Sequence, residues 1–320
     1  MSYMSRKILV TGGAGFIASH LCEALLAEGA NLVVIDNFND FYDPAIKESN
    51  IAGFRDRITL VRGDICDAAL IDSLFATQRF DMVFHFAARA GVRPSINNPR
   101  LYLGTNIDGT LNLLEGCRRN AVKHFIFASS SSVYGVNEKV PFAEHDLIQR
   151  TISPYAASKL AAEQLCSNYS HLHGMRCICL RFFTVYGPRQ RPDLAISKFT
   201  RQLMAGEPID QYGDGSTARD YTYVEDIING VMAAGRYDAS AYEIINLGGS
   251  AANTLSQLIA GLERILGVKA DIIRLPDQPG DVPLTFADVS KAHGLLGYAP
   301  ATPLAVGLER YVEWVKNLSR

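Results

Sequence analysis

The sequence lacks any long hydrophobic run. No stretch approaches the ~20 apolar residues that cross a bilayer, and the first ten residues, MSYMSRKILV, are not apolar enough for a signal peptide. An excess of one charge is also missing, because 31 lysines and arginines balance 33 acidic residues to a formal net charge of -2. This balance gives no reason to expect nucleic acid or an acidic membrane surface as a partner. We expect a cytoplasmic protein.

Cysteine is scarce and scattered. The six cysteines, at positions 22, 66, 117, 166, 177 and 179, show none of the paired spacings that are typical of metal sites. Cys177 and Cys179 alternate along an apolar segment, as residues on one face of a buried strand do. We therefore expect reduced, structural thiols and no bound metal.

What the chain does have is a regular alternation of apolar segments with segments of helical periodicity. Its 320 residues, 48% of them hydrophobic, are enough to bury a sizeable core. Strand-like segments at 7–11, 31–36, 58–64, 81–88 and 124–130 alternate with helix-like segments that include 16–26, 68–78 and 101–119. The alternation predicts an α/β fold, doubly wound (Rossmann) around a mainly parallel sheet.

A glycine turn follows the first strand. In TGGAGFIASH, Gly12, Gly15 and Ala18 occupy the three small-residue positions of a dinucleotide-binding turn, and Phe16 and Ile17 begin the helix after it. Free backbone amides and the positive end of the helix dipole can hold a pyrophosphate there. Because glycine turns without a ligand are common, this turn alone is incomplete support.

The next strand supplies the partner of that turn. It ends in Asp36, about 20 residues after the glycines, where a carboxylate can accept both hydroxyls of an adenosine ribose. Asn37 and Phe38 follow instead of arginine or lysine, so the sequence predicts NAD rather than NADP. A strand-end aspartate with a structural role is the alternative.

Small and polar residues end the next two strands. Asp64 and Ile65 lie just past the third, where they can touch adenine, and Ala87 and Ala88 end the fourth, where they leave room for a dinucleotide. Ordinary loop packing is the alternative for both pairs. His85 lies inside an apolar strand, and we expect a core histidine without a chemical role.

Candidate catalytic residues lie in SPYAASK, residues 153–159. Tyr155 and Lys159 are four residues apart at the start of a helix and therefore share one face. A nearby ammonium favours the phenolate, so Lys159 is expected to lower the pKa of Tyr155. Serines at 129–132 end the fifth strand, at the sheet edge to which the helix brings Tyr155. The same tyrosine–lysine spacing also occurs on many amphipathic helices.

The second half of the chain changes character. Prolines and glycines cluster at 187–192, 206–215 and 276–283, and the helical stretches between them are short. We expect a smaller, loop-rich α/β lobe for the substrate. The predicted division gives residues 1–185 and 220–250 to the dinucleotide-binding domain, and 186–219 and 251–320 to the lobe.

Together these motifs resemble a known family. Over almost its whole length the sequence is similar to the extended short-chain dehydrogenase/reductases, the nucleotide-sugar epimerases and dehydratases. The motifs are TGGAGFIASH, HFAARAGVRPS, ASSSSVYG, YAASK, RFFTVYGP, GDGSTARDYTYVEDI and PGDVPLTFAD. Within the family it most resembles UDP-glucuronate 4-epimerases, on DNFNDFYDPAIKESNI, AGVRPSINNP and RFFTVYGPRQRPDLAI.

The resemblance implies roles for individual residues. It implies a tightly held NAD, with Asn106 among its contacts. Tyr155 would remove the proton of the sugar 4-hydroxyl, Ser130 would hydrogen-bond the same hydroxyl, and Lys159 would lower the pKa of Tyr155 and hold the nicotinamide ribose. Arg219 would bind the pyrophosphate of a UDP-sugar, and Asp281 would lie by the uridine ribose.

The residues that would bind the sugar of the substrate are less clearly indicated by the sequence. Family members that dehydrate or decarboxylate carry an acidic residue before Val-Tyr-Gly, where this chain has serines, so the reaction is expected to stop at epimerisation. The candidates for holding a substrate carboxylate are Ser131, Ser132, Thr184 and Arg191. Arg191 could instead bind phosphate or face solvent. Arg89 and Arg93 are alternative candidates for binding the substrate carboxylate.

The expected activity is NAD-dependent 4-epimerisation of UDP-glucuronate. The alternatives are the same reaction on UDP-glucose or UDP-N-acetylglucosamine, a less favoured UDP-glucuronate decarboxylase, and a non-catalytic NAD-binding sensor. The resemblance also implies a homodimer through the helices that match 101–119 and 153–173.

Overall fold

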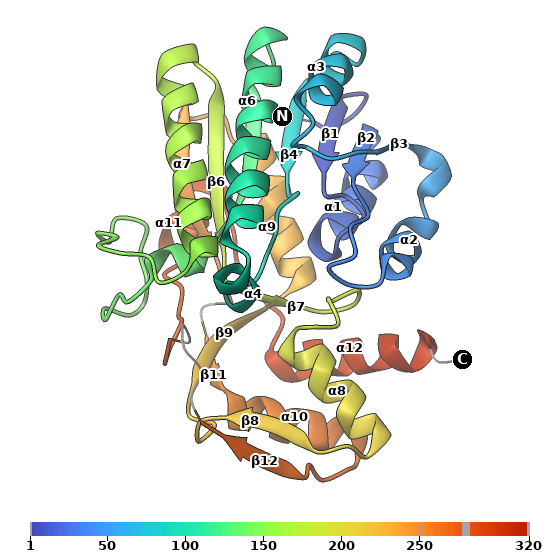
Figure 1. The fold of residues 1–320 in the computed structure, drawn as a ribbon, viewed down its shortest axis with the longest axis vertical. Coiled ribbons are helices and arrows are strands. Elements are labelled where there is room, and N and C mark those ends of the chain that lie inside the picture. Colours follow the sequence, from blue (N-terminus) through green and yellow to red (C-terminus); the bar gives the residue numbers. More distant parts are fainter. Residues whose placement is uncertain (1, 250, 277–281, 319–320) are drawn as a thin grey trace.

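A seven-stranded sheet forms the centre of the computed structural model, which describes residues 2–249, 251–276 and 282–318 (Figure 1). The strand order is β10-β6-β5-β4-β1-β2-β3, and every neighbouring pair is parallel. The strands are Lys7–Thr11 (β1), Asn31–Asp36 (β2), Ile58–Arg62 (β3), Met82–His85 (β4), His124–Ser130 (β5), Arg176–Phe182 (β6) and Tyr242–Leu247 (β10). The predicted doubly wound α/β fold is confirmed.

Helices cover both faces of this sheet. One face packs on α1 (Phe16–Ala27) and α9 (Val224–Arg236), and the other on α3 (Ala68–Thr77), α6 (Gly109–Arg119) and α7 (Pro154–His173). Successive strand residues point to opposite faces, so Ile8 and Val10 lie in the first core and Leu9 in the second. Burial on both faces explains why the strands are almost continuously apolar.

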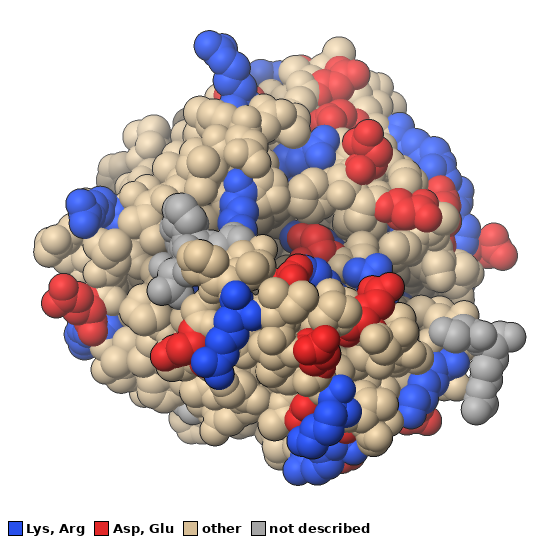
Figure 2. All heavy atoms as spheres, turned by 60° about the horizontal axis from the view of Figure 1, so that its bottom comes forward, with Lys and Arg blue, Asp and Glu red and all other residues tan. Residues whose placement is uncertain are grey.

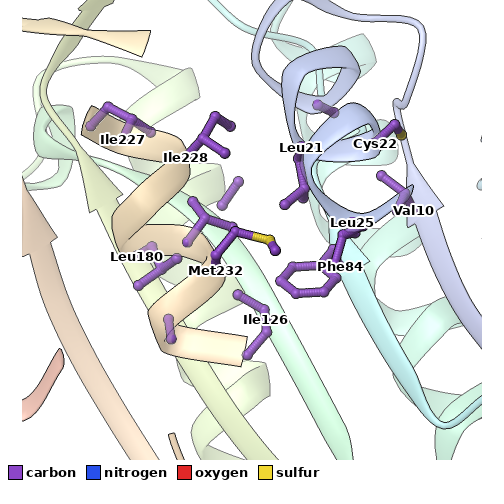
Figure 3. Close-up of a cluster of buried hydrophobic side chains, with 14 of the residues drawn as sticks. Val10, Leu21, Cys22, Leu25, Phe84, Ile126, Leu180, Ile227, Ile228 and Met232 are labelled. Carbon is purple, nitrogen blue, oxygen red and sulfur yellow. The ribbon is translucent and has the colours of Figure 1, made fainter. Parts of the chain in front are cut away.

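Figure 3 shows the first core at the meeting of α9 with α1. Met232 of α9 lies between Ile126 on β5 and the α1 side, where Leu25 packs near Phe84 of β4. Burying a side chain of this size stabilises a fold by about 1.5–3 kcal/mol. This packing fixes α1, whose N-terminal turn faces the functional site described below.

Local signals fix where α7 begins. Ser153 accepts a hydrogen bond from the Ala156 amide at 3.1 Å, and Pro154 occupies the first turn, where no intrahelical amide donor is needed. Gly174 ends the helix in the left-handed conformation, with φ of 59°. Tyr155 is thereby held in the first turn, beside the carboxyl end of β5.

A smaller lobe lies below the sheet in Figure 1. It contains the sheet β11-β9-β7, the pair β12-β8 and a core between three helices. Its elements are Thr184–Tyr186 (β7), Ala195–Ala205 (α8), Ile209–Tyr212 (β8), Ala218–Tyr223 (β9), Ala252–Thr254 (β11), Leu255–Leu266 (α10), Ile272–Leu275 (β12) and Leu304–Leu318 (α12).

The lobe departs from the sequence expectation in one respect. Residues from 220 on were expected to return to the main sheet, but β9 pairs with β7 and β11, and only α9 and β10 return. The period-2 pattern of DYTY suits either sheet, because register and partner depend on contacts distant in sequence. The residue-level division into two domains stays a prediction.

Two expected segments are shorter or divided. The strand expected at 81–88 ends at His85, and the helix expected at 101–119 consists of α5 (Pro99–Leu103), a π-helical segment (Gly104–Asp108) and α6. The remaining elements are α2 (Pro44–Ala52), α4 (Val92–Asn97), α11 (Ser290–Leu296) and the 3₁₀ turns Arg55–Arg57 and Ser131–Tyr134.

The cysteines and the charged surface have the following arrangement in the structure. All six cysteines are free, and Cys177 and Cys179 are buried on one face of β6. Over the described ranges, no helix is both long and apolar enough to cross a membrane. Acidic and basic side chains are interspersed over the face shown in Figure 2.

Candidate active site

A cavity of about 490 Å³ opens at the carboxyl ends of the parallel strands, between the sheet and the lobe. This is where a doubly wound sheet leaves a crevice for ligands. The predicted site residues in its wall are Gly12, Gly15, Phe16, Ile17, Asp36, Asn37, Asp64, Ile65, Ala87, Ala88, Ser130, Ser131, Ser132, Tyr155, Lys159, Thr184, Arg191 and Arg219. The chain thus brings most of the predicted residues together.

Three predicted residues are not in that wall. Asn106 is buried behind it, where its side chain accepts from the Arg89 amide at 2.8 Å and donates to the Arg89 carbonyl at 3.0 Å. Arg93 is exposed on α4 and stacks over the ring of Tyr212 in the lobe, 5.1 Å from the ring centre. Asp281 lies outside the described residues.

The glycine turn has the geometry that a dinucleotide requires. Gly12 has φ of 68°, and a Cβ there would lie 2.7 Å from the Ala87 amide nitrogen, so only glycine fits without a shift. Asp36 accepts hydrogen bonds from the Ala14 amide at 3.2 Å and the Phe38 amide at 2.9 Å. The carboxylate is therefore fixed beside the turn, and the residues present fit NAD.

Lys47 is a cavity residue that the sequence did not reveal. Its ammonium lies 3.5 Å from the Asp36 carboxylate, and both side chains are only 6% exposed. Burial lowers the pKa of Lys47. The two residues that follow Asp36 are uncharged, as noted from the sequence, but this cation reaches the carboxylate from α2. A lysine on an amphipathic helix gives no sequence signal that it points inward.

The ends of the neighbouring strands β2, β3 and β4 complete the part of the cavity next to the glycine turn, which we call the cofactor half. Asn37 donates to the Asp64 carboxylate at 2.8 Å, which ties the ends of β2 and β3 together. His85 is 1% exposed and hydrogen-bonds Thr11 at 2.7 Å and Thr110 at 2.9 Å, and burial lowers its pKa well below the usual value. It is a neutral core histidine, as the sequence predicted.

Tyr155 lies in the wall with its ring edge toward Tyr102, 6.2 Å between ring centres. Burial raises the pKa of Tyr155, while a hydrogen bond from Ser130 and the charge of Arg191 lower it. The expectation that Lys159 lowers the pKa of Tyr155 is wrong for this structure, because burial raises that pKa overall and only Ser130 and Arg191 oppose the rise.

Lys159 is held from behind the tyrosine. Its ammonium donates to the Ala128 carbonyl at 2.7 Å and lies 4.8 Å from the ring centre of Phe127. Burial lowers its pKa to about 8, against the raising effect of Glu163. The hydrogen bond fixes the position of the Lys159 ammonium. Because its pKa is close to neutral pH, the protonation state of Lys159 can change with small changes in its environment.

A buried ion pair supports this arrangement. Glu163, one turn after Lys159, accepts from Arg181 at 2.9 and 2.8 Å and from the Ser129 hydroxyl at 2.5 Å. The pair joins α7 to the ends of β5 and β6. Sequence reasoning missed it, because Glu163 and Arg181 are 18 residues apart on a helix and a strand, and their inward direction depends on packing.

The sugar half of the cavity is lined by hydroxyls and by Arg191, and the cavity wall also includes Arg219 and the candidate Arg89. The Ser132 hydroxyl donates to Ser130 at 2.9 Å. Arg191 makes two bonds to Asp193, at 2.9 and 2.7 Å, and stacks 5.2 Å from the ring centre of Phe41. Phe41 is a further wall residue that the sequence did not single out. A bidentate arginine of this kind is suited to carboxylate or phosphate.

These features define a class: a Rossmann dinucleotide-binding protein with a tyrosine, lysine and serine beside the crevice. Residues 8–248 match the NAD dependent epimerase/dehydratase family. The chain belongs to this family.

Individual relatives agree with the family match. UDP-glucuronate 4-epimerase 3 from Arabidopsis thaliana is 42% identical over 96% of this chain and 76% of its own length. A crystal structure of UDP-glucuronic acid 4-epimerase from Bacillus cereus, in complex with UDP-glucuronic acid and NAD, has 40% identity and a TM-score of 0.90, with 98% of this chain and 99% of that chain covered. A Thermotoga maritima UDP-glucose 4-epimerase has 33% identity and a TM-score of 0.91, with 98% and 100% covered.

Proposed function

We propose that this chain is an NAD-dependent isomerase that inverts C4 of a UDP-sugar, with UDP-glucuronate and UDP-galacturonate as the substrate pair. The observation that carries the proposal is one cavity that combines a dinucleotide turn with Ser130, Tyr155 and Lys159, and with hydroxyls and Arg191 at the far end. The relatives named as UDP-glucuronate 4-epimerases support the choice of sugar.

In the proposed mechanism Tyr155 takes the proton of the sugar 4-hydroxyl, and Ser130 orients that hydroxyl. Bound NAD supplies the acceptor for the C4 hydride. The sugar becomes a 4-ketone, turns about its link to the pyrophosphate, and regains hydride at C4 on the opposite face, while Tyr155 returns the proton to the oxygen. Substrate and product have the same oxidation level, so the reaction consumes no cofactor.

Binding far from C4 allows this rotation. Arg219 is the proposed pyrophosphate ligand, and remote contacts can hold the intermediate while the sugar ring turns. Lys159 is proposed to hold the nicotinamide ribose, with Asp36 on the adenosine ribose. Asn106 supports the cofactor site through the Arg89 backbone.

The sugar carboxylate sets a further requirement. A 4-keto glucuronate is a β-keto acid and loses CO₂ when its carboxylate is suitably oriented. Ser131, Ser132, Thr184 and Arg191 are the proposed ligands that hold it away from that orientation. Both positions between Ser130 and Val133 are serines, so no carboxylate stands there to serve a later step.

The test is incubation of the purified protein with UDP-glucuronate and no added NAD, followed by product identification. Formation of UDP-galacturonate without net NADH is expected. CO₂ release would identify a decarboxylase, and turnover of UDP-glucose alone would identify a neutral-sugar epimerase, which the Thermotoga relative favours as second candidate. Cofactor binding without any turnover would indicate a sensor.

Assembly and location are part of the same proposal. Leu101, Leu103 and Leu111, on α5 and α6, are 37–41% exposed, which suits a homodimer through these helices and α7. Six free thiols suit a reducing, cytoplasmic location. The predicted domains, 1–185 with 220–250 for NAD and 186–219 with 251–320 for the nucleotide sugar, complete the proposal.

A further inference from the structure

The loop after β7, residues 187–194, carries Arg191 into the cavity and leads into α8; we call it the arginine loop. In Figure 1 it runs beneath helix α1. Arg191 itself is 16% exposed, and its charge acts on Tyr155. The position of this loop therefore decides where a guanidinium stands relative to the reacting end of the substrate.

Helix α1 fastens this loop by side chains that face away from the sheet core. His20 is hydrogen-bonded through Nε2 to the Pro188 carbonyl at 3.0 Å. Arg189 makes two bonds to Glu23, at 2.9 and 2.8 Å, and a longer one to Ser19 at 3.4 Å. We call His20, Glu23, Pro188 and Arg189 the α1 clamp.

The backbone shows that the loop needs such a clamp. Arg189 has φ of 65°, a left-handed conformation that costs a non-glycine residue about 1–2 kcal/mol. A strained residue persists where surrounding contacts over-determine it. Here α1 holds both the guanidinium of Arg189 and the carbonyl of Pro188. These contacts fix the direction of the chain two residues before Arg191.

The other end of α1 faces the cofactor half of the cavity. Phe16 and Ile17, in its first turn, line the wall, and the Phe16 ring meets His20 edge to face with ring centres 6.1 Å apart. One rigid helix thus contacts the expected pyrophosphate site at its start and the arginine loop one to two turns later.

We propose that His20 and Glu23 are positioning residues that hold the arginine loop, so that Arg191 is preorganised for the sugar end of the substrate. They act through Pro188 and Arg189 and touch neither substrate nor cofactor. This inference rests on the proposed function for its substrate, UDP-glucuronate.

The first test is Glu23→Gln, which keeps the size of the side chain and removes its charge. The expected result is a rise of about 3- to 10-fold in KM for UDP-glucuronate, with kcat, bound NAD and melting temperature close to wild type. The matched control is Glu28→Gln, because Glu28 at the C-terminal end of the same helix is also 39% exposed and pairs with Arg236 instead of the loop. The control is expected to keep the wild-type KM.

A second pair of variants tests the histidine. His20→Phe keeps a ring and loses the donor to Pro188, and His20→Gln keeps a donor. KM should rise in His20→Phe and return toward wild type in His20→Gln. The charge-reversed pair Glu23→Arg with Arg189→Glu should recover part of the affinity lost in Glu23→Gln.

The result that overturns the clamp is a wild-type KM in both Glu23→Gln and His20→Phe, or equal changes in Glu23→Gln and Glu28→Gln. Failure of the proposed function is a separate outcome, because it appears as wild-type protein that does not epimerise UDP-glucuronate. In that case calorimetric titration with UDP-glucuronate replaces KM, and unchanged affinity in the two α1 variants would still reject the clamp.

Discussion

The two halves of the cavity differ in the part of the chain that shapes them: mainly backbone in the cofactor half and mainly side chains in the sugar half. Apart from Lys159, the cofactor half consists of strand ends and one glycine turn from the first 90 residues. Its fit depends mainly on backbone geometry, such as the 2.7 Å that would separate a Gly12 Cβ from the Ala87 nitrogen. The sugar half is assembled from the ends of β5 and β6, the start of β7, the arginine loop and β9, and its fit depends on side chains. The first is determined by local sequence and the second by tertiary contacts.

This difference teaches where each kind of change acts. Substitutions in the cofactor half should affect whether NAD binds at all, because a clash with the backbone cannot be relieved by a change of side-chain rotamer. Substitutions in the sugar half should change affinity by smaller steps, because several hydroxyls and more than one arginine line it and are proposed to share the substrate. Tyr155 lies at the boundary, where burial raises the pKa of its phenol and Ser130 and Arg191 offset part of that rise.

Tyr155→Phe should have the largest effect. Removing the phenol deletes the proposed base and acid, so kcat should fall by about 10³-fold, while bound NAD and melting temperature stay near wild type. The measurement is turnover of UDP-glucuronate, with NAD quantified after denaturation of the protein. Tyr169→Phe is the control, because Tyr169 lies on the same helix and its hydroxyl donates to Glu115 at 2.5 Å, away from the cavity. Full activity of Tyr155→Phe would refute the mechanism.

Gly12→Ala tests the cofactor half. We expect loss of bound NAD, because the added Cβ would displace the Ala87 backbone from the dinucleotide turn. Gly174→Ala is the matched control: its φ is +59° against +68° for Gly12, and no atom lies within 4 Å of the added Cβ.

Gly174→Ala should lose about 1–2 kcal/mol of unfolding free energy from backbone strain, measured by chemical denaturation, and Gly12→Ala should lose more because its Cβ also meets the Ala87 backbone. Only Gly12→Ala should lose NAD, measured by absorbance of the released nucleotide. If both variants kept NAD equally, close approach of the backbone would not be what the turn provides.

The same division explains what the sequence could predict. The Rossmann order, Gly12, Asp36 and the start of α7 follow from short-range patterns that hydrophobic periodicity and turn chemistry make visible. Lys47, Phe41 and the Glu163–Arg181 pair were missed because their inward direction depends on packing. The pairing of β9 with β7 and β11 was missed for the same reason, since strand partners are set by long-range contacts.

Thr184→Val should have the smallest effect, and it sharpens the comparison from the sugar side. The change preserves shape and removes one hydroxyl from the sugar half, so kcat/KM for UDP-glucuronate should fall by roughly 10-fold or less. Inhibition by UDP, which lacks the glucuronosyl group, should be unchanged and serves as the internal control. An equal loss of UDP affinity would assign Thr184 to the nucleotide. Loss of bound NAD would mean that the two halves are one cooperative unit, because a side chain at the sugar end would then determine cofactor occupancy.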